Sequence, residues 1–427
     1  MMETIRKFAL YLALATVASA QPLTAIKAGH LIDPETGTVS TNQVILIEGA
    51  KIKAVGGAVP AGATVIDLSR STVMPGLIDC HTHLCTPPLR ITKSFAEGPP
   101  VPMRWDTPGW PGFFLVTIVN PTGYRAIVGV KNARDMLESG FTTVRDLGHA
   151  GNYADTDLRR AIEEGLVEGP TIINSGKKIC AYGGQFTLQQ DTREAVNADY
   201  IFADTRDEMK KAIRETIHYG AKVIKIVAAG QRYIYTADDI RFIVEEAARA
   251  GLKVASDCST AQGSHNAAEG GVASIEHGVG LTDDDLEIVK KNHVNLIMNI
   301  PPASVLRAAG LTDDSWRRGA VASMKNAFER GATLAFGTDV VFSVDGMNHG
   351  QMALGFLDSY ADAGIPAQEV LRIMTTHGAR LLGVEKERGA IRAGVAADIV
   401  AMPGDPIEDI RALRKINFVM REGRRIK

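Results

Sequence analysis

The sequence predicts an α/β protein in which a (β/α)8 TIM barrel carries a small β-sandwich domain built from both chain ends. Between residues 74 and 384, apolar strand-like segments alternate with amphipathic helical patterns, as in a parallel barrel. Residues 21–73 and 385–427 consist instead of short strand-like runs and turns. The 427 residues are enough for one large barrel and an accessory domain.

The first 20 residues have the pattern of a signal peptide. Arg6 and Lys7 precede an apolar run over residues 8–15, and the small residues 18–20 provide a cleavage pattern. The run is too short to span a bilayer. We expect a mature chain that begins at Gln21 and is periplasmic or secreted, and the alternatives are a membrane anchor or a disordered arm.

Composition excludes some partners. Hydrophobic residues make up 45% and charged residues 22% of the chain, and the net charge is −2. This charge gives no electrostatic basis for binding nucleic acid, and we expect no membrane contact after signal cleavage. The four cysteines lack the spacing of a disulfide framework, so we predict free thiols, with a Cys80–Cys85 bridge as the alternative.

The two chain ends have the same sequence pattern of short strand-like runs and turns. Gly pairs and polar turns separate the strand-like runs, and we expect both ends to pair into one domain. The runs cover residues 29–34, 42–47 and 51–55 at one end and residues 389–391, 397–402 and 417–421 at the other.

The middle of the chain contains eight candidate strands, with helical patterns between them such as 207–219 and 237–250. Gly251 follows the second of these helices as a C-cap. In such a barrel the chemistry lies at the carboxyl ends of the strands. The candidate strands cover residues 77–81, 142–147, 171–175, 223–228, 254–258, 274–277, 295–300 and 333–337.

The first barrel strand ends in two histidines. The segment from Met74 reads Met-Pro-Gly-Leu-Ile-Asp-Cys-His-Thr-His, which places His81 and His83 two residues apart. Residues two apart on a strand share a face, so the two imidazoles point the same way, as two ligands of one metal must. The alternative is a strand end with two solvated histidines.

Three more polar residues end other strands: Lys225 on strand four, His277 on strand six and Asp339 after strand eight. Each has an ordinary structural explanation when taken alone, such as a buried ion-pair partner, a structural histidine or a helix N-cap. Their joint occurrence with His81 and His83 at one end of a barrel predicts a metal centre.

Five motifs together resemble the amidohydrolase superfamily over nearly the whole mature chain. They are the segments 74–83, 140–148, 223–226, 274–278 and 336–339. More narrowly the chain is similar to the imidazolonepropionase-like branch, which includes metal-dependent prolidases, carboxypeptidases and ochratoxin-degrading amidohydrolases. The resemblance implies two divalent metal ions, with zinc expected, and an N-carboxylated Lys225 that bridges them. The implied ligands are His81, His83, Lys225, Asp257, His277 and Asp339.

Position 257 departs from the family pattern. The family has a histidine at the end of strand five, whereas this chain has Asp257, and His265 lies too far along to replace it. Carboxylate can bind zinc, but it reaches less far than imidazole and adds negative charge. We therefore expect weak binding of the second metal, and from the sequence alone we expect Asp257→His to raise its occupancy and kcat.

The substrate loops also differ from the family pattern. Gly183-Gly184-Gln185 stands where many members of the branch have Gly-Gly-His, and Arg232, Tyr233 and Tyr235 follow strand four. Guanidinium and phenol groups suit a carboxylate, so these three are candidates to bind a substrate, and the alternative is that they are ordinary loop residues.

The resemblance implies a binuclear metal-dependent amidohydrolase of carboxypeptidase or ochratoxinase type. Its expected substrate is a small-molecule amide whose cleavage by metal-activated hydroxide releases a C-terminal amino acid: a dipeptide, an N-acyl amino acid or an ochratoxin A-like amide. Asp339 would be the catalytic base and acid. The alternatives are a cyclic amide or lactone hydrolase, or a binding protein on an impaired hydrolase scaffold. We expect a homo-oligomer.

Overall fold

The computed structural model describes residues 23–87, 89–91, 119–185, 194–228, 233–308 and 314–427. The predicted signal peptide lies outside these residues. Within them, no helix combines the length and the apolar character that crossing a membrane requires.

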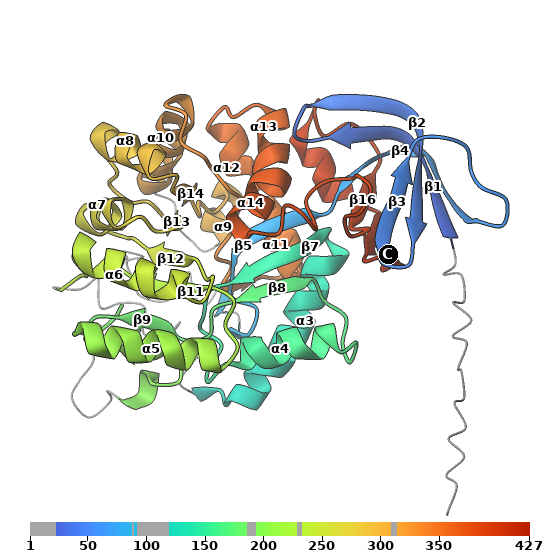
Figure 1. The fold of residues 1–427 in the computed structure, drawn as a ribbon. Coiled ribbons are helices and arrows are strands. Elements are labelled where there is room, and N and C mark those ends of the chain that lie inside the picture. The colour runs from blue at the N-terminus through green and yellow to red at the C-terminus, as the bar shows by residue number, and fades with distance from the viewer. Residues whose placement is uncertain (1–22, 88, 92–118, 186–193, 229–232, 309–313) are drawn as a thin grey trace, which may run out of the picture.

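Both chain ends contribute to one seven-stranded sheet, in the order β18-β17-β16-β4-β1-β2-β3. Figure 1 shows the blue N-terminal strands beside the red C-terminal strand β16. β16 runs antiparallel to the end of β4, with Val400 opposite Met74. The strands are β1 (Leu23–Asp33), β2 (Thr38–Glu48), β3 (Lys51–Val55), β4 (Thr64–Pro75), β16 (Ile399–Met402), β17 (Phe418–Arg421) and β18 (Arg424–Arg425).

The strands of both chain ends pair into one seven-stranded sheet, and this pairing does not directly show the sandwich that the sequence predicts. The sheet buries an apolar core of its own, which includes Ile45 and Phe418. The register between β1 and β4 shifts at Gly29, where an added Cβ would lie 2.2 Å from the backbone oxygen of Ser69. Such a shift bends and twists a sheet, which lets the sheet curve around its core.

The sheet leads into the barrel strands through Gly76. β4 ends at Pro75 and β5 begins at Leu77. A Cβ on Gly76 would lie 2.2 Å from Oγ1 of Thr142, so a larger residue would not fit this junction. The close approach fixes where β5, and with it the two histidines, enters the middle of the molecule.

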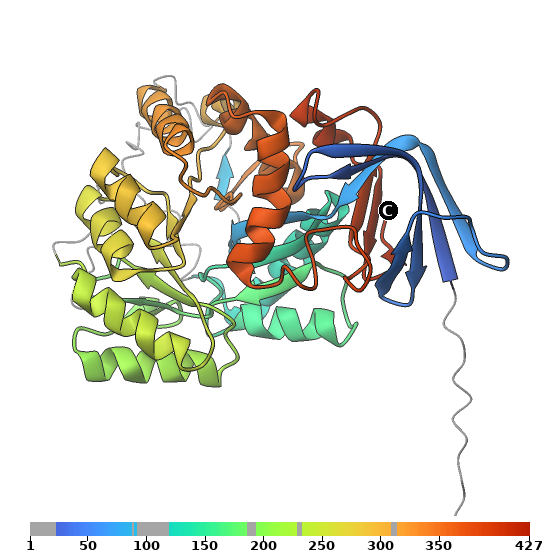
Figure 2. The ribbon, with the colours of Figure 1, turned by 45° about the horizontal axis from the view of Figure 1, so that its top comes forward.

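The middle of the chain holds parallel strands in two groups, β5-β7-β8 and β10-β9-β11-β12-β13-β14. Helices cover their outer side in both views (Figures 1 and 2). The first seven predicted strands are all present. The strands are β5 (Leu77–Thr82), β7 (Phe141–Asp146), β8 (Thr171–Asn174), β9 (Lys178–Cys180), β10 (Tyr200–Phe202), β11 (Ile224–Val227), β12 (Val254–Asp257), β13 (Ser274–Glu276) and β14 (Asn295–Ile297).

The third predicted strand continues past a kink that the sequence did not reveal. β8 pairs with β7, and after the left-handed Gly176 (φ +68°) the chain resumes as β9, which pairs with β11. The amide of Lys222 also donates to the backbone oxygen of Asn174, at 2.7 Å, and joins β8 to the segment before β11. The two halves of this strand therefore connect the two groups of strands.

The eighth candidate strand, over residues 333–337, is present only as an irregular segment. Leu334 forms only an isolated parallel bridge with Leu296, although the amide of Cys80 donates to the backbone oxygen of Phe336 at 2.7 Å. Gly337 ends the segment in a close approach, because a Cβ there would lie 2.4 Å from Ile297 and 2.9 Å from Cβ of His81. The segment still connects β14 to β5.

The helices begin with strong caps. Thr205, Thr236 and Thr282 each form a capping box with the acidic residue three positions on, which satisfies free amides of the first turn. The helices are α3 (Thr122–Glu138), α4 (Ala154–Glu163), α5 (Arg206–His218), α6 (Ala237–Ala248), α7 (Ala261–Gly270), α8 (Asp283–Lys291), α9 (Ala303–Ala308), α10 (Ser315–Glu329), α11 (His349–Gly355), α12 (Leu357–Asp362), α13 (Ala367–Arg372) and α14 (Gly378–Leu382). A π-helical turn (Ile373–His377), a 3-10 helix (Ile410–Lys415) and the strand pair β6 (Leu89–Ile91) and β15 (Phe342–Val344) complete the described elements.

All four cysteines are buried and free, as predicted, and Cys80 and Cys85 form no bridge. Burial raises the pKa of the Cys80 thiol, so it stays protonated. A Cβ on Gly378 of α14 would lie 3.3 Å from Cys80 Sγ, so this thiol faces the outer helices and not the site.

Candidate metal centre and active site

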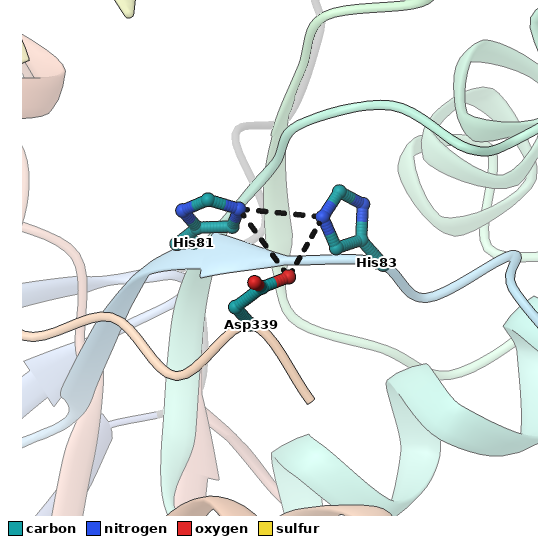
Figure 3. A group of neighbouring side chains, drawn as sticks. All are labelled: His81, His83 and Asp339. Atoms are coloured by element: carbon teal, nitrogen blue, oxygen red, sulfur yellow. Dashed lines mark hydrogen bonds and ion pairs between the residues drawn. The ribbon is translucent and has the colours of Figure 1, made fainter. Parts of the chain in front are cut away.

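His81, His83 and Asp339 form a compact group at the end of β5 (Figure 3). Nε2 of His81 lies 3.3 Å from Nε2 of His83. Oδ1 of Asp339 lies 3.0 Å from Nε2 of His83 and 3.5 Å from Nε2 of His81. The three potential ligand atoms all lie within 4.8 Å of one another, as ligands of one ion must.

Asp339 reaches this group through an unusual backbone conformation. Its φ is +55°, in the left-handed region, and its amide donates to the backbone oxygen of His81 at 2.8 Å. His277 has the same feature, with φ +69°. Non-glycine residues adopt this conformation at a cost and are enriched at functional sites. His149, with φ +54°, is a third such residue, and their concentration favours a functional site at this end of the strands.

The second nitrogen of each imidazole is held by the protein. Nδ1 of His81 lies 2.8 Å from Oε2 of Glu276, and Nδ1 of His83 lies 2.8 Å from the backbone oxygen of Gly148. Because both partners are acceptors, they assign the proton to Nδ1 and leave Nε2 with a lone pair. Both lone pairs then face Asp339.

The charges suit a divalent cation. Burial lowers the pKa of His81 to about 4, so this imidazole is neutral at pH 7 and can act as a ligand. Burial alone would raise the pKa of Asp339, but His81 and His83 outweigh it and hold this pKa below its usual value. Two imidazole nitrogens and one carboxylate are a donor set that zinc accepts in proteins.

The buried ion pair of Arg145 and Glu276 holds His81 in place. Arg145 donates to Oε1 of Glu276 at 2.7 Å and to the hydroxyl of Ser274 at 2.9 Å. Burial would raise the pKa of Glu276, but Arg145 outweighs it and lowers this pKa to about 2. Glu276 is therefore an anion that orients His81 while Arg145 balances its charge.

Glu276→Gln is expected to destabilise the protein by about 3–5 kcal/mol, because it leaves the Arg145 guanidinium buried without its anion. Thermal and denaturant unfolding would measure the loss. Glu287→Gln is a matched control, since this exposed glutamate on α8 pairs with Lys290 at the surface. Equal unfolding midpoints for the two variants would contradict the supporting role of Glu276.

The other three predicted ligands lie beside the first group. Nζ of Lys225 is 2.5 Å from Oδ1 of Asp257, and Nε2 of His277 is 3.4 Å from the same oxygen. Nε2 of His277 also lies 3.9 Å from Oδ2 of Asp339, which links the two groups. The structure thus brings all six predicted ligands to the same end of the strands.

Lys178 is a site residue that sequence reasoning missed. Its Nζ lies 3.3 Å from Oδ2 of Asp257, 2.8 Å from Nε2 of His149 and 3.2 Å from Oε1 of Gln185. It opens β9, the continuation of the third strand that the sequence did not reveal. The available signal was a pair of lysines, Lys177 and Lys178, that follows Gly176 and precedes two apolar residues, Ile179 and Cys180.

The surroundings of Asp257 do not fit a second ion with a carboxylated lysine. Oδ1 already contacts Lys225 and His277, and Oδ2 contacts Lys178 and the Gln185 amide at 3.3 Å. A carboxylate has about four lone-pair positions, and these four contacts use them. A carbamate on Lys225 would also place a second anion against Asp257, where like charges repel.

The three predicted substrate-binding residues have different surroundings. Arg232 lies outside the described residues. Tyr233 is 76% exposed. Tyr235 is buried, and its hydroxyl donates to the backbone oxygen of Ala203 at 2.7 Å, so this hydroxyl is already used inside the fold.

Comparison with known proteins agrees with this geometry. The chain is 25% identical to the ochratoxinase of Aspergillus niger over 92% of this chain and 84% of that protein. It is also 25% identical to the 5'-deoxyadenosine deaminase of Methanosarcina mazei, over 86% of this chain and 81% of that one. The crystal structure of a Xaa-Pro dipeptidase with bound methionine matches with a TM-score of 0.77 and 27% identity, over 94% of this chain and 99% of that one.

The fold of these solved relatives implies a TIM-barrel domain in this chain. The model of the Amidohydrolase family matches residues 72–426, which contain β5 and all six predicted ligands. This confirms the resemblance on which the sequence prediction rests, and the chain therefore belongs to the amidohydrolase family.

Proposed function

We propose that this protein is a metal-dependent hydrolase that cleaves an amide bond and releases a C-terminal amino acid. The observation that carries the proposal is the group of His81, His83 and Asp339, with three potential ligand atoms within 4.8 Å at the carboxyl end of the strands. Enzymes of this architecture place their chemistry at that end.

Each residue of the group has a distinct task. His81 and His83 would hold a divalent ion, for which zinc suits the donor set. Such an ion supplies Lewis acidity: it polarises a carbonyl group and acidifies water. Asp339 is the general base and acid, because its ionised carboxylate can take a proton from the attacking water and deliver it to the leaving amine. Glu276 and the Gly148 carbonyl keep the imidazoles oriented.

The substrate class follows from the relatives. An ochratoxinase and a Xaa-Pro dipeptidase are among them, and ochratoxin A and dipeptides both contain an amide whose cleavage releases an amino acid. We propose dipeptides, N-acyl amino acids and ochratoxin A-like amides as substrates, met outside the cytoplasm after removal of residues 1–20. The proposed architecture is a closed barrel in which the irregular segment 333–337 takes the place of the eighth strand, with a sandwich-like domain at the chain ends, assembled as a homo-oligomer.

A second candidate function is hydrolytic deamination, which the relative named 5'-deoxyadenosine deaminase favours. Hydrolysis of a cyclic amide or a lactone uses the same groups and remains an alternative. The third alternative is a binding protein with impaired catalysis, which the unusual Asp257 motivates.

Removal of the metal is expected to abolish hydrolysis, and zinc is expected to restore it. Purified protein, treated with a chelator and then reloaded, would be assayed for amino acid release from dipeptides, N-acyl amino acids and ochratoxin A. A lactone, a cyclic amide and 5'-deoxyadenosine complete the panel. Turnover of 5'-deoxyadenosine alone would favour the deaminase, and ligand binding without any turnover would favour the binding protein.

A further inference from the structure

Asp257 lies between two buried lysines. Nζ of Lys225 and Nζ of Lys178 contact its two different oxygens, at 2.5 Å and 3.3 Å. The lysine side chains are 0% and 2% exposed, and that of Asp257 is 3% exposed. Buried ammonium groups require an anion nearby, and Asp257 is the anion that both of them contact.

The environment of Lys178 satisfies an ammonium group fully. Its three N–H groups have three acceptors, which are Asp257, Gln185 and Nε2 of His149. Gln185 is itself held by the Tyr200 hydroxyl, at 2.7 Å. Nε2 of His149 lies 2.8 Å from Nζ of Lys178, and because an ammonium group can only donate, Nε2 accepts in this contact. The cation is thus held by a built set of partners.

The presence of Lys178 and that of Asp257 depend on each other, because each supplies the opposite charge that the other contacts. With the histidine of the family pattern at position 257, both lysines would be buried without an anion. With Asp257 but no Lys178, the aspartate would keep the partner Lys225 but lose the cation at Oδ2. The aspartate at the ligand position and the lysine that faces it therefore form a matched pair of residues.

We propose that the Lys178 ammonium replaces the second metal ion in this protein. The centre then holds one divalent ion, at His81, His83 and Asp339, while Lys225 stays an uncarboxylated ammonium paired with Asp257. The inference rests on the proposed metal-dependent function and deepens it, because it assigns the number of ions and the role of Lys178.

The sequence alone predicts that Asp257→His raises metal occupancy and kcat, and the contacts of Asp257 predict no such gain for this single substitution. Asp257→His alone removes the anion of both lysines and adds no place for an ion while Lys178 is present. The combination of Asp257→His with Lys178→Met removes the competing cation and supplies a neutral ligand of longer reach. Only this double variant is expected to gain the second ion.

Elemental analysis of the wild-type protein tests the inference first. The protein would be saturated with zinc, freed of loosely held metal by gel filtration and measured per chain. One ion per chain is the expected result. Two ions would overturn the inference and leave the proposed hydrolase function standing, whereas no ion would overturn both.

Variants at positions 178 and 257 test whether Lys178 excludes the second ion. We expect one ion in wild type, in Lys178→Met and in Asp257→His, and two ions in the double variant. Growth with ¹³C-bicarbonate would add a carbamate NMR signal in the double variant and none in wild type. A wild-type carbamate signal, or a double variant with one ion, would overturn the inference.

A neighbouring lysine provides the matched control. Lys177 is the residue before Lys178, and its Nζ lies over the ring of Tyr153, 5.6 Å from the ring centroid. Lys177→Met is therefore the same substitution at a lysine that lies against a different side chain. Lys177→Met with Asp257→His should hold no more metal than Asp257→His alone. A second ion in this control would show that Lys178 is not the competing cation and would overturn the inference.

Discussion

His81→Ala is expected to empty the metal centre and to reduce kcat/KM by more than about a hundredfold. Removing a residue that only hydrogen-bonds to a metal ligand already costs about 10- to 100-fold. The effect is larger for a ligand itself, because His81 supplies one of three potential ligand atoms and lies 3.3 Å from the second. Elemental analysis and kinetics on the same preparation would measure both losses.

The control for this variant is His265→Ala. His265 lies on α7, its side chain is 44% exposed, and it pairs with Asp285 at 2.6 Å. It is the histidine that follows the departure at position 257 in the sequence, yet it belongs to the surface. Normal metal content and turnover in His81→Ala would refute the metal assignment, and metal loss in His265→Ala would show that alanine replacement acts through the fold.

Asp339→Asn is expected to lower kcat by about 10²- to 10⁴-fold, the usual contribution of general acid–base catalysis. Asparagine has nearly the same size and keeps one oxygen, but its amide cannot take up a proton at neutral pH. His81 and His83 remain in this variant, so we expect a smaller loss of metal than in His81→Ala. Pre-steady-state and steady-state kinetics, with metal analysis, would separate the two effects.

Asp238→Asn is the matched control, because this aspartate on α6 is 75% exposed and pairs with Arg241 at the surface. A proton role for Asp339 also predicts that the acidic limb of the kcat–pH profile changes with the substitution. If Asp339→Asn lost activity only in proportion to its metal, Asp339 would be a ligand without a role in proton transfer.

The sequence alone determined the class of fold and the main metal group. Alternation of apolar strands and helices is a local property, and it located the first seven strands correctly. His81 and His83 share a face because side chains alternate along any strand, so their spacing suffices to place them together. The family resemblance, confirmed by the family model, then predicted which other strand ends meet them.

The tertiary structure alone decided three other features, because each depends on contacts between segments far apart in the chain. The eighth strand is irregular, and Gly337 at its end packs against β5 and Ile297, which no local pattern reveals. The chain ends pair into one sheet, and the register shift at Gly29 depends on the partner backbone at Ser69. The sequence showed Asp257 only as a departure from a pattern. The role of Asp257 depends on the kink at Gly176, because the chain beyond this kink places Lys178 beside the Asp257 carboxylate. The two residues are 79 positions apart in the sequence.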